Sequence, residues 1–252
     1  MSIFVFIWGL SAGLILNIII SLLSRGESVT GPPSYLSSPL RINHWLWQDL
    51  LALAASILRW GKDRGWNKLT FPRYPLPVAA LNGLLWVLVY CREGVSLNLL
   101  KGFLLVSLLL ITAVIDLREQ VIPDQLIVFG LVTGILFLFI PGLTPGPVQA
   151  LTGILTGGGL FLLIAVLSGG AMGGGDIKLM AVLGLWLGWR QILLVSFFAF
   201  ILGAAVSLGL IVLGRKNKKD YISFGPFIAL AALLSFLWGD ALVKAYFGLF
   251  TG

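Results

Sequence analysis

Charged residues are scarce in this sequence. Asp, Glu, Lys and Arg make up 11% of its 252 residues, whereas about 25% is usual in soluble domains. Hydrophobic residues reach 58%, and the mean hydropathy is +1.01. This composition excludes an ordinary soluble domain and predicts an integral membrane protein, folded as a single membrane-embedded domain over residues 1–252.

Cysteine and histidine are almost absent too. Cys91 is the only cysteine, which excludes an internal disulfide and a multi-cysteine metal site. His44 is the only histidine, and a zinc site needs three or four ligands, so we expect no metal site. The net charge of +7 comes from residues in gaps between apolar runs that form no basic face with interleaved aromatics, so we expect no nucleic-acid partner.

Long apolar runs dominate the chain instead. Eight of them, each near the length of about 20 residues that crosses a membrane, lie at 2–23, 76–91, 97–115, 125–140, 148–168, 176–189, 191–213 and 225–248. They predict an all-α, polytopic bundle of about eight transmembrane helices. The runs at 76–91 and 176–189 are near the lower limit for crossing without help from neighbouring helices.

The basic residues predict the orientation of this bundle. With the amino terminus outside, only four of the 17 Lys and Arg residues fall on the outer side: Arg92, Lys101, Arg190 and Lys244. The positive-inside rule therefore places both termini outside. The polar stretch 24–75 becomes a cytoplasmic loop, in which residues 44–60 fit an amphipathic helix lying on the inner membrane surface.

Two carboxylates then meet at the inner membrane boundary. Asp116 ends the run 97–115, and Asp176 opens the run 176–189. Ionisable groups at this depth are costly, so each needs a partner or a function. Two adjacent carboxylates share a proton and can hydrolyse a peptide, since one takes a proton from water while the other donates to the scissile carbonyl. Structural alternatives fit as well: Asp176 as a helix cap after a flexible turn, and Asp116 as an interfacial group paired with Arg118.

Several neighbours of the aspartates are candidate site residues. Gly173, Gly174 and Gly175 lack a Cβ and would let an extended substrate backbone approach Asp176. We expect Asp124 to cap the helix after Asp116, with support of the carboxylate pair as the alternative. Lys178 would either act on Asp176 or contact a lipid phosphate, and we favour the lipid.

The motifs around both aspartates resemble those of one family. Gly-Gly-Gly-Asp-Ile-Lys-Leu at 173–179 resembles the Gly-x-Gly-Asp motif of the type IV prepilin peptidases, which are membrane aspartyl proteases. Asp-Leu-Arg-Glu-Gln-Val-Ile-Pro-Asp at 116–124 is similar to that family's other aspartate motif, and Ser-Phe-Gly-Pro-Phe at 223–227 to a segment before its final helix. The resemblance implies Asp116 and Asp176 as the catalytic dyad, with Pro123, Asp124 and Lys178 as supporting residues.

The family also implies a substrate class. Its members remove a short basic leader from prepilin or pseudopilin-like precursors at the cytoplasmic face of the bacterial inner membrane, in pilus assembly and protein secretion, cutting after a glycine. Many members bind metal through two Cys-x-x-Cys pairs in the first inner loop and methylate the new amino terminus with S-adenosylmethionine. The loop 24–75 has no cysteine. We therefore expect no zinc, no methylation and no cofactor, with S-adenosylmethionine needed only if methylation is retained.

Two other classes of protein compete with a peptidase. A proton- or cation-coupled carrier would use the same carboxylates, although these would then lie nearer the middle of the membrane. A noncatalytic scaffold of a pilus or secretion complex would need neither carboxylate. Both remain open on the sequence.

Overall fold

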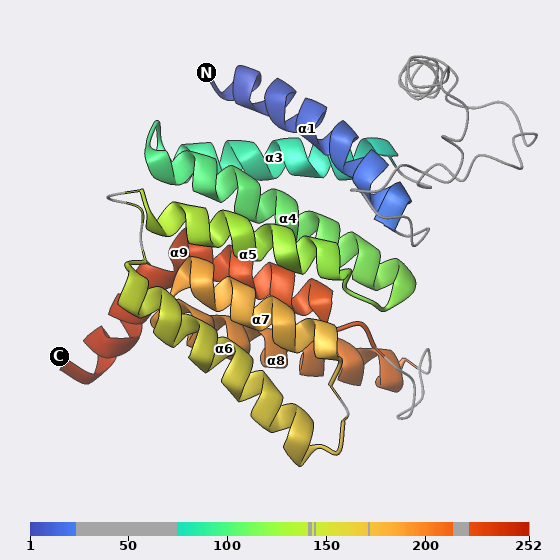
Figure 1. Cartoon of the computed structure of the whole chain (residues 1–252), viewed down its shortest axis with the longest axis vertical. Coiled ribbons are helices and arrows are strands. Elements are labelled where there is room, and N and C mark those ends of the chain that lie inside the picture. Colours follow the sequence, from blue (N-terminus) through green and yellow to red (C-terminus); the bar gives the residue numbers. More distant parts are fainter. Residues whose placement is uncertain (24–74, 141–142, 144, 171, 214–221, 252) are drawn as a thin grey trace, which may run out of the picture.

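The chain folds as a bundle of α-helices in the computed structural model, which describes residues 1–23, 75–140, 143, 145–170, 172–213 and 222–251 (Figure 1). Within these ranges every regular element is a helix, in the order α1 (Ser2–Leu23), α3 (Pro75–Glu93), α4 (Leu97–Glu119), α5 (Asp124–Leu138), α6 (Pro147–Leu167), α7 (Gly174–Leu187), α8 (Trp189–Val212) and α9 (Gly225–Thr251). Each predicted apolar run corresponds to one of them, so the all-α polytopic prediction is confirmed. The interfacial helix expected at 44–60 lies outside the described residues.

Most of the described helices have the length and composition of membrane spans. Five of those described, α1, α3, α4, α6 and α8, are long and apolar enough to cross a membrane, while α5 and the Gly225–Gly239 part of α9 are shorter apolar helices. The beginning of α1 and the end of α9 lie at the same end of the bundle (Figure 1). That arrangement agrees with two termini on one side of the membrane, and which side remains a prediction.

Helix α7 lies at the centre of the bundle and packs against α5, α6, α8 and α9. Most of its residues are buried, among them Leu183 and Trp186. The indole Nε1 of Trp186 donates to the carbonyl of Gly130 in α5 at 2.7 Å, and its ring meets Phe137 edge-on. With 14 residues, α7 is about 21 Å long, shorter than the hydrocarbon core of about 30 Å. Neighbouring helices rather than lipid surround it, which explains how so short a helix fits.

Glycines bring α6 and α7 into backbone contact. A Cβ on Gly153 would collide with the carbonyl of Gly184, and a Cβ on Gly184 with the carbonyl of Gly153. A Cβ on Gly157 would likewise collide with the carbonyl of Met180, whereas a Cβ on Gly159 would meet none of the described residues. Such small-residue contacts are the usual basis of close helix packing in membranes, and they fix the position of α7.

A chain of polar side chains joins α1, α3 and α4. Asn82 donates through Nδ2 to the carbonyl of Gly9 at 2.7 Å and accepts the hydroxyl proton of Ser107 at 3.0 Å. Trp86 donates through Nε1 to Ser107 at 3.0 Å. Because polar groups in a membrane interior need partners, this chain anchors α4, the helix that carries Asp116, to its neighbours.

Candidate active site

Asp116 belongs to the last turn of α4 and is 4% exposed. Its Oδ2 accepts a hydrogen bond from the backbone N–H of Gly225, the first residue of α9, at 2.8 Å. Its carbonyl accepts the hydroxyl proton of Ser223 at 2.8 Å. The alternative pairing with Arg118 is wrong, since Arg118 is exposed and α9 provides the partner of the carboxylate.

Asp176 lies in the first turn of α7 and is 6% exposed. Helix α7 begins at Gly174, two residues earlier than the apolar run predicts, and its N-cap is Gly173. The alternative in which Asp176 caps this helix is therefore wrong. Asp116 lies near enough for its charge to act on Asp176. Two helices distant in sequence thus bring two buried carboxylates to the same end of the bundle.

The three glycines before Asp176 have different surroundings. Gly173 is partly buried at the N-cap. Gly174 is exposed, with none of the described residues within 4 Å of a Cβ built on it. Gly175 packs against Ile122 of the α4–α5 connection, where an added Cβ would lie 3.0 Å from the Ile122 Cβ. Open space lies beside Gly174, while Gly175 holds α7 against the segment that follows Asp116.

Two of the three residues predicted to support the aspartates, Asp124 and Lys178, pair with each other. Pro123 is the N-cap of α5, with φ −63° and ψ 134°, and Asp124 is the first helical residue. The prediction that Asp124 caps this helix is therefore wrong, because Pro123 occupies the N-cap position and Asp124 already belongs to the helix. Lys178 donates to Asp124 Oδ1 at 2.7 Å, and both side chains are exposed, 54% for Lys178 and 71% for Asp124. Contact of Lys178 with a lipid phosphate stays a prediction. This exposed ion pair joins the beginnings of α5 and α7.

Ser223 and Gly225 contact Asp116, but the sequence analysis assigned them no role. It singled out their segment only because that segment resembles one in the family. A signal was nevertheless present, since a glycine and a proline at 225–226 open an apolar helix, and a helix N-terminus carries backbone N–H groups without internal partners. The contact with Asp116 spans more than 100 residues of chain, which no local pattern reveals.

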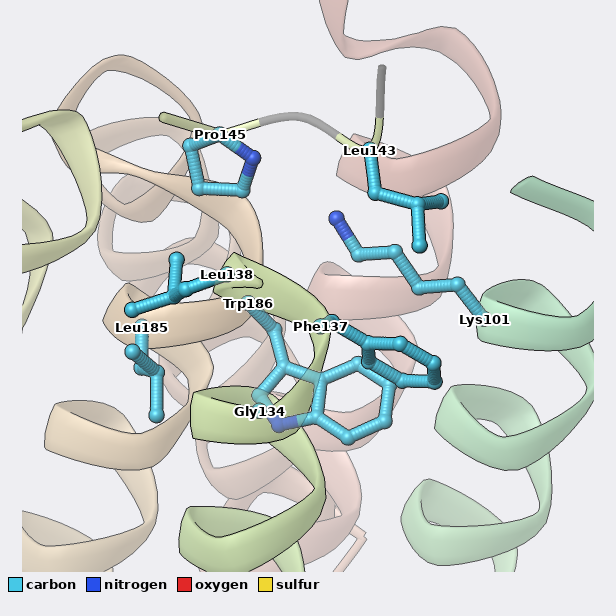
Figure 2. A pocket seen from close by; sticks show the side chains of 8 residues that line it. All are labelled: Lys101, Gly134, Phe137, Leu138, Leu143, Pro145, Leu185 and Trp186. Atoms are coloured by element: carbon cyan, nitrogen blue, oxygen red, sulfur yellow. The ribbon is translucent and has the colours of Figure 1, made fainter. Parts of the chain in front are cut away.

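A small pocket beside the buried Lys101 lies at the opposite end of the bundle. This pocket has a volume of about 10 Å³. Figure 2 shows the side chains that line it, which are Lys101, Gly134, Phe137, Leu138, Leu143, Pro145, Leu185 and Trp186. Lys101 stands 15 residues before Asp116 on α4, or about 22 Å along the helix. A cavity of this size has room for about one water molecule. It cannot hold a peptide, and it is separate from the two aspartates.

Fold and site together define a multi-pass helical membrane protein with two buried carboxylates brought together at one end of its bundle. The type IV leader peptidase family matches residues 103–208, a range that includes both aspartates and the three glycines. No solved structure matches the chain.

Curated relatives are similar in sequence to most of the chain. The prepilin leader peptidase/N-methyltransferase of Aeromonas hydrophila is 34% identical over 229 residues, covering 87% of this chain and 79% of that protein. The protein of the same name from Klebsiella pneumoniae is 34% identical, covering 75% of this chain and 86% of its own length. That from Bacillus subtilis (strain 168) is 30% identical, covering 79% of this chain and 79% of its own length. The chain belongs to the type IV leader peptidase family and is a membrane peptidase. This membership gives no support to the carrier.

Proposed function

We propose that Asp116 and Asp176 are the catalytic dyad of an aspartyl endopeptidase that removes leader peptides from prepilin-type precursors. The observation that carries the proposal is the meeting of two buried carboxylates, one from α4 and one from α7, close enough for their charges to interact. A pair of carboxylates that shares one proton has both the acid and the base that amide hydrolysis requires.

The reaction balances with water as the only co-reactant. The ionised carboxylate takes a proton from water as the water oxygen attacks the scissile carbonyl carbon, and the protonated carboxylate gives its proton to the carbonyl oxygen. When the C–N bond breaks, the leaving nitrogen takes the proton held by the first carboxylate. The second carboxylate recovers its proton from the collapsing intermediate, so the dyad ends in its starting state.

Groups beside the dyad suit a basic, extended peptide. Gly174 is exposed, and a substrate backbone can approach it closely because glycine lacks a Cβ. Glu119 is exposed at the end of α4, one turn beyond Asp116, and its charge would attract a basic leader. The names of the curated relatives supply the substrate class, prepilins. Cleavage after a glycine and before an apolar helix remains our expectation.

The proposal also includes a location in the cell and a cofactor requirement. The excess of Lys and Arg between the runs supports a cytoplasmic position for the dyad and outward termini in a bacterial inner membrane. The relatives' names also include an N-methyltransferase. We expect none here, and hence no S-adenosylmethionine or zinc, since the loop 24–75 lacks the cysteines of many family members.

The test is cleavage of a co-expressed precursor that carries a basic leader, a glycine, a phenylalanine and an apolar helix. The mass of the product amino terminus reports the cut, and the mass of an added methyl group would report methylation. Asp176→Asn should abolish cleavage, whereas Glu93→Gln, an acid-to-amide change at the opposite end of the bundle, should keep it. Cleavage by a well-folded Asp176→Asn protein would remove Asp176 from the dyad.

A further inference from the structure

The N-terminus of α9 has one backbone donor that its own helix cannot use. Pro226 has no N–H, and the N–H groups of Phe227 and Ile228 both donate to the carbonyl of Phe224, at 3.1 and 3.2 Å. The N–H of Gly225 points away from the helix and donates to Asp116 Oδ2. The first turn of α9 is thus arranged so that its free donor meets a carboxylate of the candidate dyad, where the positive end of the helix dipole also favours an anion.

Gly225 is also the residue type that this contact requires. A Cβ at position 225 would lie 2.7 Å from Asp116 Oδ2 and 3.0 Å from its Cγ. Carbon and oxygen atoms do not approach so closely without a bond, so any larger residue would push the carboxylate aside. The neighbouring Ser223 donates its hydroxyl proton to the Asp116 carbonyl and fixes the backbone below the same side chain. Backbone and carboxylate of one residue are therefore both held by α9.

We infer that Gly225 and Ser223 are positioning residues, which hold Asp116 through the N-terminus of α9 so that one carboxylate oxygen is fixed and the other faces the reaction. The inference rests on the proposed function. Oδ2 is occupied by the Gly225 N–H, which leaves Oδ1 to exchange a proton with water. General acid–base catalysis depends on such placement within hydrogen-bond reach, and a displacement of about 1 Å can cost about 100-fold in rate.

The experiment measures kcat and KM for cleavage of a purified precursor by the full chain in detergent. Gly225→Ala should lower kcat about 100-fold with KM unchanged, because the added methyl moves Asp116 and not the substrate. Ser223→Ala, which loses one hydrogen bond, should lower kcat about fivefold to tenfold, and Ser223→Thr should restore it. A residue needed only for folding would lower the yield of monodisperse protein without this change in kcat alone.

Matched controls separate the inference from general damage. Gly209→Ala adds the same methyl in α8 where no described residue lies within 4 Å. Ser196→Ala removes a buried hydroxyl whose hydrogen bond among the described residues is to Ile192 in its own helix. Both should keep kcat within about twofold. If Gly225→Ala does not fold, the Ser223 pair decides.

Two results would overturn the inference. One is a folded Gly225→Ala protein with the wild-type kcat, and the other is a Ser223→Ala protein that behaves like Ser196→Ala. Absence of cleavage by the wild-type chain would instead reject the proposed function, so the two failures are distinguishable.

Discussion

Replacement of each aspartate by asparagine tests whether Asp116 and Asp176 act as one unit. Asparagine has nearly the same shape, and its side-chain oxygen can still accept the N–H of Gly225, so the contact of α4 with α9 should survive in Asp116→Asn. The amide cannot take or give the catalytic proton. General acid–base catalysis contributes about 10²- to 10⁴-fold, or about 3–5 kcal/mol of activation free energy, so each single variant should lose at least that much in kcat.

The double variant makes the test decisive. If the two carboxylates contributed independently, their losses would multiply to about 10⁴- to 10⁸-fold. If they share one proton, the first replacement already disables the pair, and the second should cost less than about tenfold more. Single-turnover cleavage of a purified precursor measures the rates, and size-exclusion chromatography in detergent checks that each protein is folded. Multiplying losses, or a folded single variant with near wild-type activity, would refute the dyad.

Three predictions concern stability and are measured by thermal unfolding in detergent. Neutralising Asp124 or Lys178 should cost at most about 1 kcal/mol, because the pair is exposed, and exchanging the two residues should restore most of the loss. Gly184→Ala should cost about 1–3 kcal/mol or more by forcing α6 and α7 apart, whereas Gly159→Ala, with open space beside it, should change stability by less than about 0.5 kcal/mol. Trp186→Phe should cost about 1–2 kcal/mol through its lost hydrogen bond to α5, and an unchanged unfolding temperature would contradict that contact.

Helix positions could be predicted from the sequence because the signal is strong and local. A membrane span needs about 20 apolar residues, and polar or glycine- and proline-rich segments separate the runs. The run at 97–115 corresponds to α4, and the run at 148–168 to α6. Asp116 and Asp176 could be singled out because a carboxylate beside an apolar run is conspicuous in a chain with so few charges.

Contacts between helices could not be predicted in the same way. Apolar composition is nearly uniform, so it does not show that α7 is central and α1 peripheral. The pairing of Lys178 with Asp124 joins two turns that are 54 residues apart, and the sequence favoured lipid for the one and a cap for the other. The sequence indicates only that a helix begins at Gly225. The contact of Gly225 with Asp116 depends on the packing of α4 against α9, which the sequence does not show.

The properties of helix ends explain why the two carboxylates lie at one end of the bundle and not halfway along it. In the middle of a membrane helix every backbone N–H is already bonded within the helix, so a buried carboxylate there would depend on side-chain donors alone. Where α9 begins, a free N–H is available and meets Asp116. Hydrolysis also consumes water, and the substrate must offer an extended backbone, both of which are found at the membrane boundary and not within hydrocarbon. The short length of α7 also favours this position of the carboxylates. Glycine contacts with α6 hold α7 in the core, while Asp176 in the first turn of α7 lies close to the exposed Gly174.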